Sequence, residues 1–239
     1  MKCCDLTLAS PEENLACDEV LLDLCEAGSL EGVLRFWEPT QYFVVVGYAN
    51  RAGVEVNRDF CQRHDIPIFR RCSGGGAVLQ GPGCLNYSLM LPIAGEAELA
   101  GIGGTNDYVL HRHQQVLQTV LRAPVEKQGY TDLTVGGLKF SGNAQRRRRD
   151  FLLFHGCFLL HADIDLMEKA LPLPSHQPGY RINRSHEDFL MNLKVPANLL
   201  KAALKKAWDA TGTLTEIPLD QISALARERY SQESWNLKF

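Results

Sequence analysis

The sequence of 239 residues lacks the features that would assign it to a membrane or to nucleic acid. No apolar run reaches the roughly 18–20 residues that a helix needs to cross a bilayer. Basic residues are not in excess, because 25 lysines and arginines stand against 28 aspartates and glutamates, a net charge of −3. Dedicated nucleic-acid binders are usually basic. We therefore expect neither a membrane nor a nucleic acid as partner.

The sequence also lacks the patterns of a secreted or metal-stabilised chain. Residues 1–17 carry charges and no apolar signal-peptide core, and the eight cysteines include no Cys-x-x-Cys pair. His111 and His113 are two apart on an expected helix and face different ways, and no carboxylate spacing completes a metal site with His155 and His161. These absences predict a reduced, cytoplasmic chain without a metal site built from its own residues.

What is present is an ordinary globular composition, with 45% hydrophobic residues, and a mixture of helix and strand patterns. Ser10-Pro11-Glu12-Glu13 is typical of a helix start, Gly28 of a helix end, and Gly136-Gly137 of a tight hairpin. Strands are expected over 33–37, 42–47, 66–71, 85–91, 133–135, 138–146 and 151–160, and further helices over 57–65, 105–121, 163–171, 196–211 and 219–230. Since the strands cluster centrally without βαβ alternation, we predict one α/β (α+β-like) domain over residues 1–239, with a mixed, largely antiparallel sheet flanked by helices.

The most informative segment is Arg70-Arg71-Cys72-Ser73-Gly74-Gly75-Gly76-Ala77-Val78. Adjacent glycines allow the main chain to approach a ligand closely and to turn its N–H groups toward an anion. A neighbouring arginine adds a permanently charged donor suited to phosphate. The segment is neither a Walker A loop nor a Rossmann fingerprint. Taken alone, it is equally consistent with a flexible glycine hairpin.

Two further segments carry unusual residues in strand patterns. Lys139 follows the expected Gly136-Gly137 turn and precedes Ser141-Gly142, and His155-Gly156 lies inside an apolar run. A lysine on a strand is usually a solvated edge charge, and a glycine weakens a strand unless something packs closely against it. The neighbours Leu138 and Phe140 and the nearby glycine make an inward-facing role plausible for Lys139.

Five short motifs, in their order and approximate spacing, resemble the lipoate–protein ligase family, whose relatives are the octanoyltransferases and the biotin ligases. The resemblance extends from about Leu15 to Asn192. The motifs are Arg71-Cys72-Ser73-Gly74-Gly75-Gly76-Ala77-Val78, Leu85-Asn86-Tyr87-Ser88, Thr131-Asp132-Leu133, Lys139-Phe140-Ser141-Gly142-Asn143-Ala144-Gln145 and His155-Gly156.

The resemblance implies a biotin/lipoate ligase-like catalytic fold and an enzyme that activates lipoic or octanoic acid with ATP and Mg²⁺. The acyl group would then pass from the acyl-adenylate to a lysine of a lipoyl-carrier domain. Lys139 would be the catalytic residue, between the α-phosphate and the acyl carbonyl oxygen. The ATP and lipoyl-AMP site would comprise Arg71, Ser73, Gly74, Gly75, Gly76, Ala77, Val78, Leu79, Asn86, Asp132, Ser141, Gly142, His155 and Gly156.

Within the family, the ligase branch fits best. One octanoyltransferase branch uses a cysteine in a late Pro-Cys-Gly segment, and another places it before the strand of the lysine, where this sequence reads Gly129-Tyr130-Thr131-Asp132. Neither cysteine is present, and Cys72, Cys84 and Cys157 are expected to pack in the core. The alternatives are an octanoyl or lipoyl transferase that uses a preformed acyl donor, and a non-catalytic lipoate- or adenylate-binding protein.

Two features concern partners. Many ligases of the family carry a further C-terminal accessory domain, for which this sequence has no room, so we expect adenylation either to be slower or to need a separate accessory protein. The run Arg146-Arg147-Arg148-Arg149 is expected at the tip of a hairpin. It is either a solvated turn or a surface that attracts an acidic carrier domain, since opposite charge speeds encounter.

Overall fold

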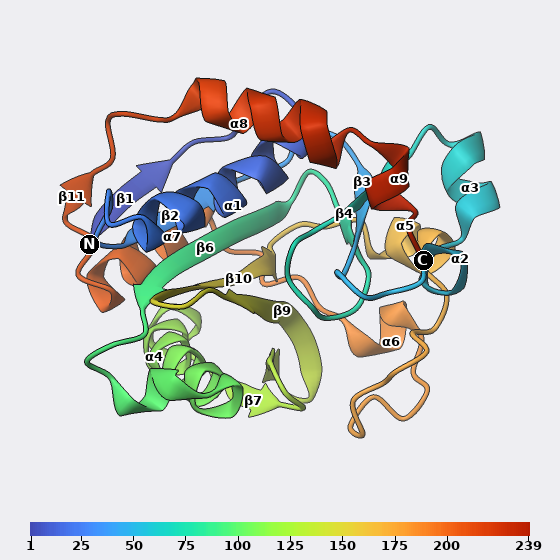
Figure 1. Cartoon of the computed structure of the whole chain (residues 1–239). Coiled ribbons are helices and arrows are strands. Elements are labelled where there is room, and N and C mark those ends of the chain that lie inside the picture. Colours follow the sequence, from blue (N-terminus) through green and yellow to red (C-terminus); the bar gives the residue numbers. More distant parts are fainter.

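The computed structural model describes residues 1–239 and is built around a large sheet (Figure 1). Its strands are β1 (Lys2–Asp5), β2 (Val33–Trp37), β6 (Cys84–Pro92), β7 (Glu126–Gln128), β8 (Asp132–Val135), β9 (Leu138–Arg147), β10 (Phe151–Leu159) and β11 (Gly212–Thr213). Their order is β11-β1-β2-β6-β10-β9-β8-β7. β1 is parallel to β2 and β11, and the other pairings are antiparallel. The prediction of an α/β fold with a mixed, largely antiparallel sheet is confirmed.

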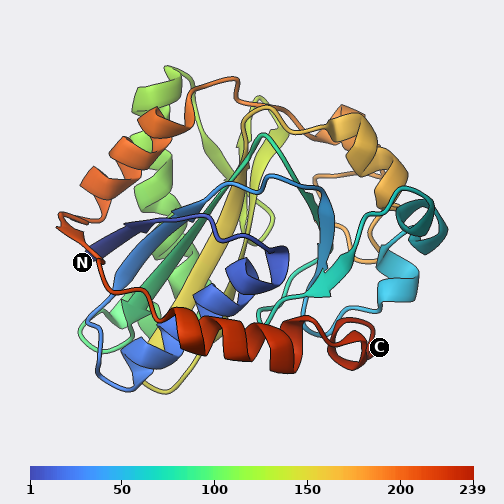
Figure 2. The same cartoon turned by 90° about the horizontal axis from the view of Figure 1, so that it is seen from above.

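Helices cover both faces of this sheet, as Figures 1 and 2 show. One face carries α1 (Pro11–Glu26) and α8 (Leu219–Leu225), which continues through a π-helical turn, η2 (Ala226–Tyr230). The opposite face carries α4 (Ile102–Leu121) and α7 (Ala197–Ala207). The two termini lie far apart in both views. None of the helices is both long and apolar enough to cross a bilayer.

The two-residue period of the strands divides the core between these helical layers. On β10, Phe154 and Phe158 pack in a cluster with residues of α4 and α7, whereas Leu153 packs in a second cluster with α1 and Tyr230. His113 of α4 belongs to the first layer, because the Trp208 indole N–H donates to its Nε2 at 2.9 Å. Burial lowers the pKa of His113 to about 3. His113 is thus a neutral core residue, while His111 is exposed.

A second, three-stranded sheet stands beside the first and was not expected from the sequence. It has the order β4-β3-β5 and consists of β3 (Phe43–Val46), β4 (Ile68–Arg70) and β5 (Val78–Gln80). Both faces of β3 are buried: Phe43 and Val45 pack with α1, and Val44 and Val46 pack with another group of helices. That group comprises α2 (Ala52–Glu55), α3 (Arg58–Arg63) and α5 (Ile164–Ala170).

Short-range signals located several element boundaries correctly. The Ser10 hydroxyl accepts the Glu13 N–H at 3.2 Å as the cap of α1. Gly136 and Gly137 have φ values of +57° and +76° in the β8–β9 turn, as a hairpin of this type requires. Asn57 caps α3, which was expected to extend over 57–65 but ends at Arg63.

Other expectations were wrong in extent. The helix expected over 196–211 ends at Ala207, since Asp209 turns the chain with φ +46°, and Gly212–Thr213 adds a short strand to β1. The helix expected over 105–121 begins earlier, at Ile102. The strands β1 and β7 and the short elements η1 (Ala97–Ala100), α6 (His186–Phe189) and α9 (Glu233–Asn236) complete the chain.

Candidate active site

A cavity of about 190 Å³ opens between the loop that joins β4 to β5 and the strands β6, β9 and β10 of the large sheet. We call residues 73–76 of that connection the glycine loop. Most of the residues that the family resemblance assigns to the site meet here. They are Arg71, Gly75, Gly76, Ala77, Val78, Asn86, Asp132, Lys139, Gly142, His155 and Gly156.

Four of the expected site residues do not line this cavity, although they adjoin it. Ser73 is 1% exposed and bonds to His155, and the Gly74 carbonyl accepts from Arg71. Leu79 packs in the core between β5 and α5. The hydroxyl of Ser141 is buried without a hydrogen-bond partner.

The glycine loop is shaped from the inside by Arg71. The Nε and Nη2 groups of this arginine donate to the Gly74 carbonyl at 3.0 and 2.7 Å, and Nη2 also donates to the Gly76 carbonyl at 2.8 Å. Gly75 has φ +85°, and a Cβ atom there would lie 2.8 Å from Nη2. Burial lowers the pKa of the Arg71 guanidinium to about 10. The positive charge therefore lies directly under the loop backbone.

The cavity is also lined by Lys139 of β9, which is held by Asp132. The Lys139 Nζ lies 2.8 Å from Asp132 Oδ1, and the Tyr180 hydroxyl donates to Asp132 Oδ2 at 2.8 Å. The lysine side chain remains 25% exposed, so its ammonium can reach a ligand. A Cβ atom on Gly142 would lie 2.8 Å from this nitrogen. The absence of a side chain at Gly142 thus leaves room for the ammonium.

Further polar groups of the cavity are tied to one another. The Tyr87 hydroxyl donates to Asn143 Oδ1 at 2.5 Å, and the Asn143 amide donates to the Thr131 carbonyl at 2.6 Å. The Asn86 amide donates to Gln80 Oε1 at 2.9 Å. Because each amide is fixed by its neighbour, the floor of the cavity is a preorganised surface of donors and acceptors.

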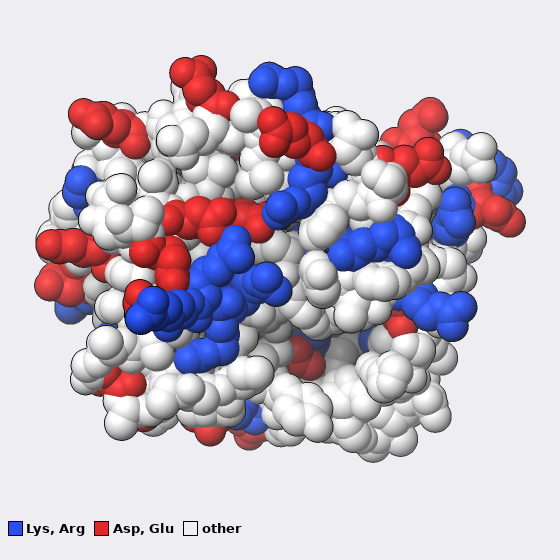
Figure 3. Space-filling view, viewed as in Figure 1, with Lys and Arg blue, Asp and Glu red and all other residues white.

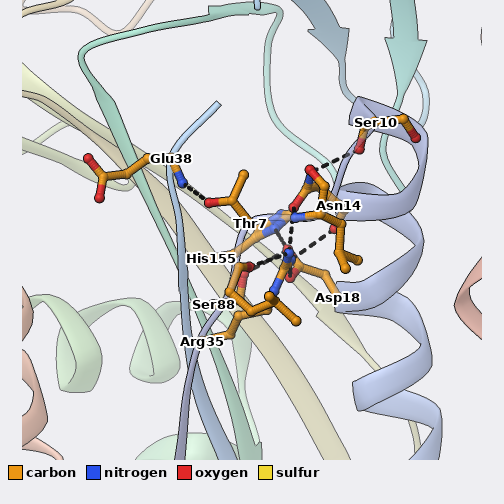
Figure 4. A network of polar contacts seen from close by, with 10 residues as sticks. Thr7, Ser10, Asn14, Asp18, Arg35, Glu38, Ser88 and His155 are labelled. Carbon is orange, nitrogen blue, oxygen red and sulfur yellow. Dashed lines mark hydrogen bonds and ion pairs between the residues drawn. The ribbon is translucent and has the colours of Figure 1, made fainter. Parts of the chain in front are cut away.

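Behind the cavity lies a buried polar network that the sequence did not reveal (Figure 4). Asp18 on α1 forms an ion pair with Arg35 of β2 at 2.6 Å, and accepts the Ser88 hydroxyl at 2.7 Å. His155 Nδ1 lies 3.4 Å from Asp18 Oδ2, and His155 Nε2 lies 2.6 Å from the Ser73 hydroxyl. The charged residues come from elements far apart in the sequence, so only the fold brings them together.

The residues of the cavity wall that sequence reasoning did not assign to the site share no single pattern. Several lie within or beside the motifs of the family resemblance, and this position next to the motifs is the sequence feature that could have identified them. They are Leu15, Asp18, Trp37, Val45, Gln80, Tyr87, Ser88, Thr131, Asn143, Ala144 and Cys157. Leu15, Trp37 and Val45 supply an apolar part of the wall.

Of the three cysteines near the site, Cys72 and Cys157 have raised pKa values, and Cys84, whose pKa is lowered by its hydrogen bond with Cys157, does not line the cavity. Cys72 and Cys84 are buried, and burial raises the pKa of the Cys72 thiol to about 12. Cys157 lines the cavity, but the neighbouring Cys84 side chain and burial raise its pKa well above the ordinary value. Since the thiolate is the nucleophilic form, the structure keeps Cys157 in its unreactive form. No group of three or more His, Cys, Asp or Glu side chains is arranged to hold a metal ion.

The arginine run occupies the end of the β9–β10 hairpin, and basic side chains gather there on the face drawn in Figure 3. The arginines of this run differ in how far other groups of the protein already engage their charges. Arg147 donates to the Leu99 carbonyl at 2.6 Å, and Arg148 pairs with Asp23 at 2.7 Å. The Arg149 side chain is 90% exposed. The patch is thus partly neutralised by the protein itself, and Arg149 is its most accessible charge.

The cavity combines a glycine loop supported by the buried Arg71 with the ammonium of Lys139, an arrangement suited to an enzyme that handles an anionic ligand and transfers a group from it. The chain belongs to the family described as the lipoyl protein ligase A/B catalytic domain, whose sequence model matches residues 10–201. The recognition of this family from the sequence motifs is confirmed.

Relatives of both activities are similar to the chain. An octanoyltransferase LipM of Brevibacillus brevis is 28% identical, over 96% of this chain and 95% of the relative. A lipoate-protein ligase A subunit 1 of Thermoplasma acidophilum is 26% identical, over 94% of this chain and 91% of the relative. At these identities, membership of the family is clear, whereas the choice between ligase and transferase is not made by similarity.

Solved structures have the same fold. A lipoate-protein ligase A bound with ATP has a TM-score of 0.79 at 24% identity and covers 99% of both chains. A bi-partite lipoate protein ligase of Thermoplasma acidophilum, studied with its E2 lipoyl domain, has a TM-score of 0.78 at 25% identity. It covers 99% of this chain and 96% of that one.

Proposed function

We propose that this chain is a lipoate–protein ligase that forms an acyl-adenylate from lipoate or octanoate and ATP. It then transfers the acyl group to a lysine of a lipoyl-carrier domain. The observation that carries the proposal is that Lys139 lines the same cavity as Gly75 and Gly76 of the glycine loop, with Asp132 at 2.8 Å from its ammonium. Residues 1–239 act in this proposal as one catalytic domain.

Each half-reaction concentrates negative charge where Lys139 can stabilise it. In the first, a carboxylate oxygen of the fatty acid attacks the α-phosphorus of ATP, and pyrophosphate leaves. In the second, the carrier lysine attacks the acyl carbonyl, an amide forms, AMP leaves, and the amine gives up a proton. A fixed ammonium near the shared phosphate and carbonyl oxygens stabilises both transition states. Asp132 holds that ammonium in place, and the buried Arg71 orients the loop amides.

The residues fit the ligands that such a reaction needs. The glycine loop presents backbone toward an anion, and the apolar Leu15, Trp37 and Val45 offer a surface for an acyl chain. Mg²⁺ would enter bound to the phosphates of ATP, since Asp132 is the acidic residue nearest to Lys139 and is already paired with it. When bound, the ion would neutralise part of the phosphate charge. A structural neighbour with the same fold binds ATP.

The second candidate is an octanoyltransferase that takes its acyl group from a thioester donor. It is favoured by the similarity to the octanoyltransferase LipM over nearly the full length of both chains. The state of Cys157 argues against it, because its pKa is raised well above the ordinary value. In addition, no cysteine stands in the segment 126–131 before β8. A thioester mechanism would thus lack an activated thiol.

Two protein partners follow from the proposal. The first is the carrier domain, whose acidic surface would meet the exposed end of the arginine run at Arg149. The second is a separate accessory subunit that supports adenylation. A related ligase from Thermoplasma acidophilum is bi-partite, and a relative from the same organism is called subunit 1.

The proposal is tested by comparing two acyl sources on one carrier domain. We expect transfer from synthetic lipoyl-AMP to be fast with the chain alone, because positioning of the adenylate and the incoming lysine suffices. We expect the reaction from ATP and lipoate to be slower, or to require an accessory subunit, since ATP also carries two phosphates that must be clamped. Equal rates from both sources would show that the chain needs no partner. Absence of transfer from lipoyl-AMP would refute the ligase assignment.

A further inference from the structure

The hydrogen bonds around His155 form one continuous chain from the protein core to the glycine loop. The chain starts at Arg35, which is fully buried and donates to Asp18 at 2.6 Å. It continues over 3.4 Å from Asp18 Oδ2 to His155 Nδ1, and over 2.6 Å from His155 Nε2 to the Ser73 hydroxyl. Ser73 is the first residue of the glycine loop. Side chains alone thereby link β2, α1, β10 and the glycine loop.

The ionisation of Asp18 decides the direction of this chain. Burial alone would raise the pKa of Asp18. The Arg35 charge, His155 and the Ser88 hydroxyl lower it by more, so the pKa of Asp18 lies below its ordinary value. An ionised carboxylate only accepts hydrogen bonds. The proton facing it must therefore sit on Nδ1 of His155, and in the neutral ring Nε2 becomes the acceptor. The Ser73 hydroxyl must then donate to His155.

A serine, a histidine and an aspartate in this order have the geometry of nucleophilic catalysis, yet their placement points elsewhere. Ser73 is 1% exposed and does not line the cavity, whereas His155 and Asp18 do. The Ser73 hydroxyl is therefore not placed to attack an acyl carbonyl bound in the cavity. The Ser73 carbonyl is also fixed, because it accepts the Tyr48 N–H at 2.8 Å. Ser73 is thus the anchored start of the glycine loop.

The following glycines need such an anchor. A Cβ atom on Gly74 or Gly76 would meet no atom within 4 Å, so no side chain packs against the loop at these two positions, whereas the main chain at Gly75 lies close against Gly47. Apart from main-chain contacts, Arg71 and the Ser73 hydroxyl are the side-chain ties that keep the loop amides in place. We propose that Asp18 is a positioning residue for nucleotide and adenylate binding: it fixes the ring of His155, which in turn holds Ser73 and the glycine loop. This inference rests on the proposed function for its ligand.

A measurement of which nitrogen of His155 carries the proton tests this series of hydrogen bonds without any substrate. In the ¹⁵N spectrum of the free protein labelled at histidine, with His155 assigned from the His155→Gln variant, we expect a proton on Nδ1 of His155. In Asp18→Asn the side-chain amide can donate to Nδ1, so the proton should move to Nε2, provided that circular dichroism shows a folded chain. A ring that carries no proton on Nδ1 in the wild-type protein would overturn the proposal.

The kinetic arm uses Ser73→Ala, which removes the last bond of the chain and keeps the histidine ring. With lipoyl-AMP as donor and one carrier domain, we expect KM to rise about three- to tenfold, the value of one intramolecular hydrogen bond, while kcat stays within about twofold. The control Ser223→Ala removes a serine hydroxyl of α8 that donates to Glu13 at 3.5 Å and does not line the cavity, and it should leave both constants unchanged. An unchanged KM in Ser73→Ala, or an acyl ester trapped on Ser73, would contradict the proposal.

The two arms separate this inference from the ligase assignment. If lipoyl-AMP is not used at all but His155 carries its proton on Nδ1, the ligase assignment fails and the hydrogen-bond chain stands. If wild-type transfer is fast while Nδ1 of His155 carries no proton, the ligase assignment stands and the positioning role of Asp18 fails.

Discussion

The ion pair between Asp18 and Arg35 should dominate the stability of the fold around the cavity. The Arg35 side chain is 0% exposed and that of Asp18 4% exposed. Arg35 also donates to the Asn14 carbonyl at 2.9 Å and to Asn14 Oδ1 at 2.7 Å. Replacing Asp18 by asparagine keeps the shape and removes the negative charge, which leaves the guanidinium buried and uncompensated.

Breaking one side of a buried pair costs about 3–5 kcal/mol. A typical domain has a free energy of unfolding of about 5–15 kcal/mol, so the loss is a large part of the total. For a chain of this size, about 2–4 °C of Tm per kcal/mol converts the loss into about 6–20 °C. The assay is urea unfolding followed by circular dichroism, with the Tm measured in parallel.

The exposed pair of Asp165 and Lys169 provides the matched control. Their side chains are 63% and 53% exposed, so Asp165→Asn should change stability far less than Asp18→Asn. The pH dependence has a defined sign. Because the folded pKa of Asp18 is lowered, its contribution is present above the ordinary aspartate pKa and is lost as the pH falls through the folded pKa. A loss below about 1 kcal/mol for Asp18→Asn, or equal losses in both variants, would refute the reasoning.

Three further changes probe the cavity itself. Lys139→Ala should lower the rate of acyl transfer by at least about 10²–10³-fold with the fold intact, and Lys139→Arg should not rescue it, because a planar guanidinium does not replace a compact ammonium; near-normal rates in either variant would remove Lys139 from the mechanism. Cys157→Ala should retain transfer, since a thiol with a raised pKa is not the nucleophile, and a hydroxylamine-labile acyl-enzyme on Cys157 would contradict this. Gly142→Ala should lower transfer by about tenfold at unchanged Tm, because the added Cβ would lie 2.8 Å from the flexible end of Lys139 and push the ammonium aside; full activity would show that the ammonium has no fixed place.

The elements that the sequence predicts well are those fixed by neighbouring residues. The Ser10 cap and the Gly136-Gly137 turn depend on a few adjacent positions, and both are where the pattern places them. The second sheet depends on the pairing of β3 with β4 and β5, which both lie well after it in the sequence, and on helices that bury its far face. No local pattern contains that information.

The site divides in the same way. The glycine loop and Lys139 belong to compact motifs, so their meeting at one cavity was predictable from the family resemblance. Asp18 appears in the sequence as one acidic residue among several on an amphipathic helix. Its importance comes from Arg35 and His155, which lie 17 and 137 residues away. A buried charge is recognisable only once its partner is known.

The central claim is that Lys139 and the glycine loop act on an acyl-adenylate. The most direct test offers the same carrier domain to the chain with two donors in separate reactions, lipoyl-AMP and an octanoyl thioester, and follows the carrier by mass spectrometry. The account predicts acylation of the carrier lysine from lipoyl-AMP, its loss in Lys139→Ala, and no acylation from the thioester above the background without enzyme. Faster transfer from the thioester than from lipoyl-AMP would contradict it and place the chain among the transferases.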